Sequence, residues 1–432
     1  MRLPGLLAAC LAVASVAVAT SVDAQVAVRS VEDTGAKSTV SAGGQVREQY
    51  EWFANEEWGA EVPDANGYWL QRYMFHLDAQ LSHHVRLYGE LKSGIEVGRV
   101  GGPRPPDEDH LDLHQGFVDL SFGGLTVRVG RQELAFGSQR LVSVREGPNM
   151  RQTFDAGKVM VQRGRWRVDG FGAGYVSTDP GVFDDSPDTG RALWGVYAVR
   201  SRTHDHTEGI DFYYLGYRRL EATFDQGKGR EVRHSWGARF WRTSSPLDYN
   251  FEAVVQTGRF ANTDIRAWTI ASDTGYRMET VPGRPRLGLR ADITSGDRDP
   301  HDDRLGTFNP MFLRGDYFGL ISTVAPANHL DLHPQVTLNM RDDLVLNATW
   351  LFFWRNQVGD GIYGIPGNVL RSAEGTRSRF VGQSPGIEAV WQVTPHLSLT
   401  GNASLFTAGS FIQESGPAST IGYLAGWTTF RF

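Results

Sequence analysis

Apolar and polar residues alternate along most of this chain with a period of two. In segment 287–294, Leu287 and Leu289 fall on one face of the pattern and Arg290 and Asp292 on the other. A period of two with one apolar face is typical of β-strands, and helical periodicity is hard to find. The pattern therefore predicts an all-β protein. The same alternation recurs in segments 83–92, 234–242, 386–393 and 396–405.

The connections between these segments come in two sizes. Short ones include Gly123-Gly124 and residues 163–165. Strands of about ten residues, joined alternately by tight turns and long loops, are typical of an antiparallel outer-membrane β-barrel. At roughly 22 residues per strand and loop, the chain predicts about 18 transmembrane strands. The long polar connections are residues 55–67, 99–112, 178–190, 297–305 and 359–378.

The amino terminus has the pattern of a secretory signal peptide. A basic start is followed by an apolar run from Leu3 to Ala19 and a small-residue cleavage box that ends at Ala24. We expect residues 1–24 to be removed on export. A lipid anchor at Cys10 is an alternative, but it would leave a much shorter apolar run. Without Cys10 the exported chain contains no cysteine and forms no disulfide.

The remaining chain is predicted to form a flexible arm (25–44) and one barrel (45–432). It ends in YLAGWTTFRF, an aromatic-rich final strand. Outer-membrane barrels resemble one another here, so we expect Phe432 to be read by the barrel assembly machinery. A soluble β-sandwich would show the same alternation. Mixed charge on the polar faces, Trp and Tyr near strand ends and the lack of a 40–50-residue repeat favour the barrel, with lipid as a partner.

Composition adds two constraints. Glycine (50 residues) and aromatic residues (23 Phe, 14 Tyr, 12 Trp) are abundant, and the formal net charge is −6. An acidic chain gives no reason to expect nucleic acid as a partner. No cofactor is expected.

Positive charge is concentrated in residues 130–158. The inner wall of a wide barrel faces water, and a basic zone there would raise the local concentration of anions. Arginine also binds carboxylates through two parallel hydrogen bonds, which suits a sugar acid. The alternative is that these charges lie in solvated loops. The candidate lumen residues are Arg131, Arg140, Arg145, Arg151, Lys158, Arg239 and Arg290, with Glu133, Glu146 and Asp155 as counter-charges.

Several separated blocks resemble the alginate export family of outer-membrane barrels. They are GRQELAFGSQRLVSVREGPNMRQTFDAGKV (130–159), SGDRDPHDDRLGTFNPMFLRGDYFG (295–319), residues 328–364 and the closing strands up to FRF. The resemblance implies an 18-stranded channel for an anionic polysaccharide. It also implies binding roles for Arg131, Arg140, Arg145 and Arg151, with Asp155 as counter-charge. Periplasmic secretion proteins are candidate partners.

Two other motifs point to different chemistry. Asp297, Asp299, Asp302 and Asp303 are candidate calcium ligands, although the EF-hand pattern fails because Phe308 stands where the bidentate Glu belongs. GQSPG (382–386) matches a serine-hydrolase motif, but the sequence after it alternates like a strand rather than a helix. We therefore expect no enzyme activity.

The sequence thus predicts a passive outer-membrane channel for an alginate-like polyuronate or its oligosaccharides. A general or small-anion porin is the alternative. A barrel enzyme and a plugged structural barrel are more distant ones.

Overall fold

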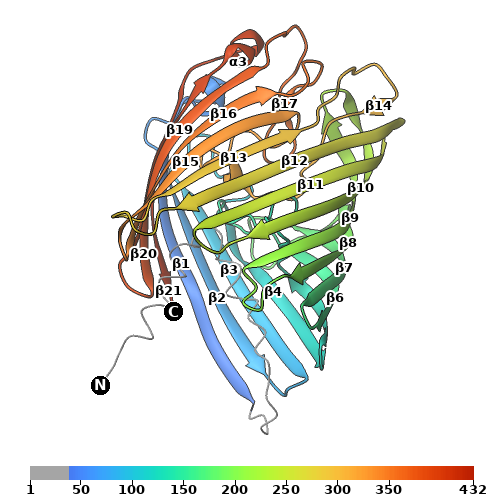
Figure 1. Ribbon diagram of the computed structural model, residues 1–432, viewed down its shortest axis with the longest axis vertical. Coiled ribbons are helices and arrows are strands. Elements are labelled where there is room, and N and C mark those ends of the chain that lie inside the picture. The colour runs from blue at the N-terminus through green and yellow to red at the C-terminus, as the bar shows by residue number, and fades with distance from the viewer. Residues whose placement is uncertain (1–37) are drawn as a thin grey trace.

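The computed structural model describes residues 38–432, and in this part of the chain 18 antiparallel strands close into one barrel (Figure 1). Each strand pairs with the next along the chain, and β21 (Ile421–Arg431) pairs back with β1 (Thr39–Ala54), from Gln45 opposite Arg431 to Ala54 opposite Gly422. The predicted fold class and strand number are confirmed.

The other wall strands follow in chain order. They are β2 (Tyr68–Gln80), β3 (Val85–Val97), β4 (Asp109–Phe122), β5 (Leu125–Gln132), β6 (Phe154–Arg163), β7 (Trp166–Ser177), β8 (Ser186–Ser201), β9 (Glu208–Phe224), β10 (Gly227–Arg242), β11 (Leu247–Phe260), β12 (Thr263–Arg277), β13 (Arg286–Thr294), β15 (His329–Arg341), β16 (Leu344–Arg355), β19 (Phe380–Gln392) and β20 (Leu397–Ala408).

Short elements lie in the connections between these strands. They are α2 (Glu56–Gly59), β14 (Arg304–Leu305), η2 (Gly315–Phe318), β17 (Ile362–Tyr363), β18 (Val369–Arg371) and α3 (Ser410–Ser415). Among the described residues, no helix has the length and apolar character needed to cross a bilayer.

The wall has an apolar outer face and a polar inner face. On β13, Leu287 and Leu289 are 46% and 47% exposed, while Arg290 and Asp292 point inward to ion pairs with Asp273 and Arg140. Membrane lipid offers no hydrogen bonds, so a spanning sheet is stable only when every strand edge is paired and apolar side chains face outward. The alternation that predicted strands is therefore also the alternation between lipid and lumen.

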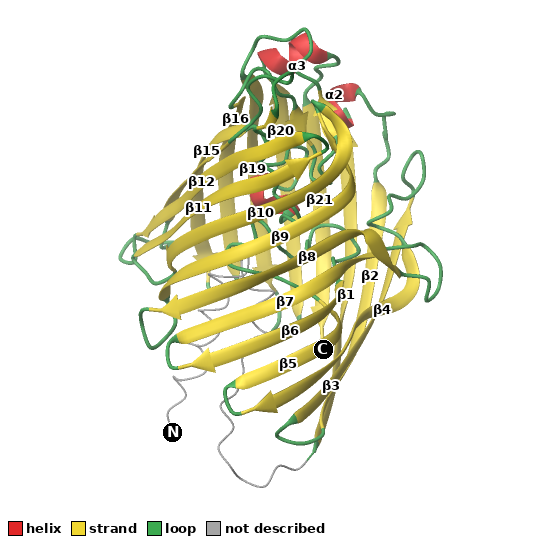
Figure 2. Cartoon of the chain, turned by 90° about the vertical axis from the view of Figure 1, so that its right-hand side faces the viewer, coloured by secondary structure: helices red, strands yellow, loops and turns green. Residues whose placement is uncertain are grey.

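The two ends of the barrel differ. The carboxy terminus and most of the tight turns lie at one end, and α3 with most of the long loops lies at the other (Figures 1 and 2). Residues 39–44, which the sequence assigns to a flexible arm, belong to β1, because Thr39 pairs with Gln80 of β2. Residues 25–37 of the predicted arm lie outside the described residues. Residues 1–24, the predicted signal peptide, lie outside the described residues.

Three long connections, residues 133–153, 295–328 and 356–379, fold back into the barrel. The first two are joined by backbone bonds: Ser143 N donates to Phe312 O, and Phe312 N donates to Leu141 O, both at 2.9 Å. Apolar residues of these loops, such as Phe136 and Phe312, share a buried cluster with inward residues of β7 and β9. Residues 141–144 do not belong to the wall, because β5 ends at Gln132 and β6 starts at Phe154.

A charged side chain should destabilise the barrel when it is placed on the lipid-facing side of the wall and should have little effect on the lumen side. Ala403 of β20 pairs with the lipid-facing Leu424, and its neighbour Asn402 faces the lumen. We expect Ala403→Arg to lower the free energy of unfolding by about 2–4 kcal/mol, because arginine would be placed in hydrocarbon. We expect Asn402→Arg to change it by less than about 1 kcal/mol. Urea titration of both variants in lipid vesicles measures the difference; equal losses would contradict the assignment of faces.

Candidate functional site

A cavity of about 860 Å³ remains between the inner loops and one sector of the wall. The wall sector is formed by β16, β19, β20, β21 and β1, and the opposite side by residues 139–148, 314–323 and 364–370. Its lining extends from Asp343 and Gln392, beside the tight turns, to Glu56 and Arg99 at the long-loop end. The cavity therefore follows the barrel from one end toward the other.

The cavity wall carries more acidic side chains than basic ones, which differs from the arginine-rich lumen that the sequence predicts. The reason is that carboxylates from both the loops and the wall strands reach the cavity. The acidic residues are Glu51, Glu56, Glu57, Glu61, Asp64, Asp107, Glu146, Asp316, Asp343 and Glu388; the basic ones are Arg47, Arg99, Arg104, Arg145, Arg314 and Arg431.

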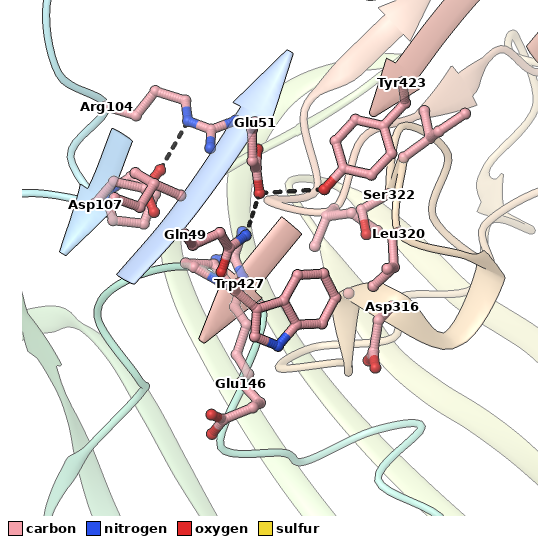
Figure 3. Close-up of a pocket in the computed structure, with 18 of the residues that line it drawn as sticks. Gln49, Glu51, Arg104, Asp107, Glu146, Asp316, Leu320, Ser322, Tyr423 and Trp427 are labelled. Carbon is pink, nitrogen blue, oxygen red and sulfur yellow. Dashed lines mark hydrogen bonds and ion pairs between the residues drawn. The ribbon is translucent and has the colours of Figure 1, made fainter. Parts of the chain in front are cut away.

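Glu146, which lines this cavity (Figure 3), is surrounded by buried arginines. It forms ion pairs with Arg72 of β2 and, at 2.8 Å, with Arg151. Arg47 of β1 donates to the backbone carbonyls of residues 146, 147 and 148 at 3.1–3.2 Å. Burial works in the opposite direction, but these arginines hold the pKa of Glu146 well below its usual range. Glu146 thus anchors the loop to the wall as a carboxylate.

Arg145 has no such partner. It lies in the left-handed region (φ 57°) and is one of the residues that line the cavity. Burial lowers its pKa, and its Nε has no hydrogen-bond acceptor in the described part of the chain. Nor does any described carboxylate lie within ion-pair distance of Arg145, Arg47 or Arg431, whereas Arg99 and Arg104 are paired with Glu56 and Asp107.

Arg151 and Glu133 lie beside the same cluster, with their charges balanced. Arg151 Nε is 3.2 Å from Glu133 Oε1, and Glu133 also contacts His114 Nε2 at 2.8 Å. Arg151 does not line the cavity. Of the predicted lumen cations, Arg145 lines the cavity, and its binding role stays a prediction.

Arg131 and Asp155 form an ion pair on the outer face of the wall. Arg131 Nε donates to Asp155 Oδ1 at 2.9 Å, and the residues are register partners on β5 and β6. Alternation along β5 places Arg131 on the same face as Val129, which is 60% exposed. The next residue, Gln132, is buried and lies on the inner face. This placement differs from the lumen position that the sequence predicts.

Four other predicted cations point inward but are neutralised by neighbours. They pair with inward carboxylates of the wall and do not line the cavity. The pairs are Arg140 with Asp292 (3.4 Å), Lys158 with Asp169 (3.0 Å), Arg239 with Asp211 (2.9 Å) and Arg290 with Asp273 (3.0 Å).

Sequence reasoning missed Arg47, Arg431 and Trp427, which line the cavity from β1 and β21. A signal for them was available. On β1, inward residues such as Arg47 alternate with outward residues at a period of two. The same alternation continues along β21 up to Arg431. Because β1 and β21 close the barrel, these residues from opposite ends of the chain are neighbours.

The other motifs do not assemble into sites. Asp297 is buried, whereas Asp299, Asp302 and Asp303 are exposed, and the four do not form a metal-ligand group among the described residues. Ser384 lies within β19, and His396 lies in the tight turn that follows this strand. His396 Nδ1 contacts the carbonyl of Arg431 at 2.8 Å, so it is not positioned to act on Ser384.

The carboxylates that do cluster are Asp109, Asp112 and Asp185. The ammonium group of Lys92 lies 2.8 Å from Asp109 and 2.6 Å from Asp185. A side-chain cation therefore already occupies the position that a metal ion would take.

Comparisons with known proteins agree with this architecture. A family model described as alginate export matches residues 38–423. Among solved structures, OccK11 (OpdR) of Pseudomonas aeruginosa is 12% identical with a TM-score of 0.61, and the match covers 94% of this chain and 98% of that one. OccK2 (OpdF) of the same organism, solved in complex with glucuronate, is 10% identical with a TM-score of 0.60, covering 92% and 98%.

OpdK of Pseudomonas aeruginosa, solved with vanillate, is 9% identical with a TM-score of 0.61, and the match covers 91% of this chain and 98% of that one. In the comparison with curated proteins, nothing matched the sequence.

The closed barrel, its lipid-type outer face and its internal cavity define a porin-type channel of the bacterial outer membrane. Within that class, the chain belongs to the alginate export family, whose model covers most of its length. The matched proteins are channels rather than enzymes.

The cluster around Glu146 should control ion selectivity. We expect Glu146→Gln to raise the anion-to-cation permeability ratio by roughly twofold or more, because it removes a negative charge between three arginines in a confined tube. Reversal potentials in a salt gradient across planar bilayers measure this ratio.

Asp155→Asn is the matched control, since it removes a carboxylate from an arginine pair on the outer face. We expect it to leave the ratio unchanged. A similar shift in both variants would mean that Asp155 lies in the conducting path.

Proposed function

We propose that this channel conducts an anionic saccharide, an alginate-like polyuronate or its oligosaccharides, past Arg145, Arg47 and Arg431. The observation that carries the proposal is that these three cavity-lining arginines lack a carboxylate partner in the described part of the chain. An uncompensated guanidinium in a narrow, low-dielectric passage attracts anions, and a free planar fork fits a carboxylate. Arg47, whose terminal nitrogens donate to loop carbonyls, would act through its charge.

The acidic residues of the cavity are consistent with this role. Glu56, Glu57, Glu61 and Asp64 lie at the long-loop end, away from Arg431 near the tight turns. Conduction requires binding that is strong enough for entry and weak enough for release. Carboxylates that follow the basic stretch would repel a bound polyanion and shorten its residence time. The cavity would then bind each sugar acid briefly and in steps.

Family membership supports a polysaccharide substrate, and two structural neighbours support the charge of that substrate. OccK2 was solved with glucuronate and OpdK with vanillate, and both ligands are carboxylates. A small-anion porin is the second candidate. It is favoured by the near-complete coverage of those OccK structures by this chain.

Removing the charge of Arg145 should weaken binding of uronate oligomers. We expect Arg145→Gln to raise the concentration of oligomannuronate that half-blocks the channel by about five- to tenfold, since a charge-assisted hydrogen bond is lost. Arg145→Lys retains the charge without the planar fork. Its half-blocking concentration should lie between those of the wild-type channel and Arg145→Gln. Single-channel block in planar bilayers measures the constant.

Arg131→Gln provides the control, because it removes an arginine from the same segment on the outer face. It should leave the block unchanged. If Arg145→Gln also has no effect, the proposed basic path is wrong; if only monouronates block the wild-type channel, the small-anion porin is the better description.

A further inference from the structure

The cavity contains an aromatic surface that the charge arguments do not use. Trp427 of β21 is half-buried and projects into the cavity, with Gln49 and Glu51 of β1 on one side and Leu320 of the inner loop on the other (Figure 3). Its indole N–H has no acceptor among the described residues. A tryptophan on the inner, water-facing wall is not explained by lipid contact, because the aromatic girdle residues point outward.

Strand register places an apolar row at the level of Trp427. Trp427 pairs with Gln49 on one side and Thr400 on the other, and the row continues through Val390 to Val345. All five residues line the cavity. The row therefore combines one indole ring and two aliphatic side chains with an amide and a hydroxyl, across five neighbouring strands.

Polar rows border this surface on both sides. Toward the tight turns lie Arg47, Thr429, Ser398 and Gln392, which follow one another in register or through adjacent strands. Toward the long loops lie three further residues of the cavity wall, Glu51, Glu388 and Asn347. Neighbouring rows are two residues apart, or about 7 Å along a strand.

This arrangement fits a pyranose ring. One face of a pyranose carries C–H groups that pack on an aromatic ring, and its edge carries hydroxyl groups that require hydrogen-bond donors and acceptors. An aromatic ring gives a large contact area at low conformational cost, and the flanking amides, hydroxyls and carboxylates can satisfy the edge. A small inorganic anion would gain nothing from the apolar row.

We propose that Trp427 is the stacking platform of a pyranose-binding subsite formed by β1, β21, β20, β19 and β16. The ring of one sugar residue packs on the indole, its hydroxyls bond to Gln49 and Thr400, and the carboxylate of a hexuronate reaches toward Arg47 one row away. This subsite adds a sugar-binding surface to the proposed function, and the contact between the carboxylate and Arg47 rests on that function. The stacking component applies equally to neutral hexoses.

The test compares Trp427→Ala and Trp427→Phe with the wild-type channel, using oligomannuronate, a neutral malto-oligosaccharide of equal length and benzoate as blockers. We expect Trp427→Ala to weaken block by both saccharides by about fivefold or more, Trp427→Phe to retain most of it, and benzoate block to change by less than twofold. Trp236→Ala, which removes a lipid-facing indole on β10, is the matched control and should change none of the three.

The outcomes separate the subsite from the proposed function. If Trp427→Ala leaves saccharide block unchanged while Arg145→Gln weakens uronate block, the subsite is wrong and the anionic path stands. If the neutral oligosaccharide binds through Trp427 and the uronate does not block at all, the subsite stands and the proposed substrate charge is wrong. Equal loss of benzoate block in Trp427→Ala would indicate a change of pore shape and would overturn the stacking role.

Discussion

The pairing of β1 with β21 is the constraint on which the rest of the structure depends. A sheet edge cannot be left open in hydrocarbon, because each unpaired backbone group there costs several kcal/mol. Closure pairs residue 45 with residue 431 and so fixes, for every strand in between, the parity of the residues that face inward. That parity decides which side chains meet lipid and which meet water. It also places Arg47 and Trp427, which are 380 residues apart in the chain, in adjacent rows of one cavity wall.

Charge inside this barrel is mostly compensated. Most inward arginines pair with an aspartate or glutamate of a neighbouring strand, as Arg239 does with Asp211. Buried ion pairs of this kind add little net stability, because desolvation offsets the attraction between the charges. Their consequence is electrical: a paired arginine hardly contributes to the field along the passage. The arginines that matter for conduction are therefore the few that the wall and the loops leave unpaired.

The fold was predictable from the sequence because lipid enforces a period of two on every strand, as the exposed Leu287 and the inward Arg290 illustrate. The site was predictable only in part. Arg145 lines the cavity and Arg131 does not, because adjacent residues of a strand face opposite sides of the sheet and charge alone does not show which side a residue takes. Arg47 and Trp427 were missed because neither lies in the basic segment 130–158, although alternation along their strands could have placed both on the inner face. Their importance comes from barrel closure, a contact between chain ends that no local pattern reports.

The packing of the inner loops determines which part of the wall lines the cavity. Residues 133–153 and 295–328 share an apolar cluster with β6 to β12, and this packing fills that side of the lumen. The cavity lies against the sector from β16 to β1, where Phe318, Ile321 and Val324 of the second loop also pack on the wall. Many of its lining side chains belong to paired strands. Side chains on paired strands keep their spacing far better than side chains on loops. The positions of the lining groups along this sector are therefore set by strand register, two residues or about 7 Å apart on one face of a strand.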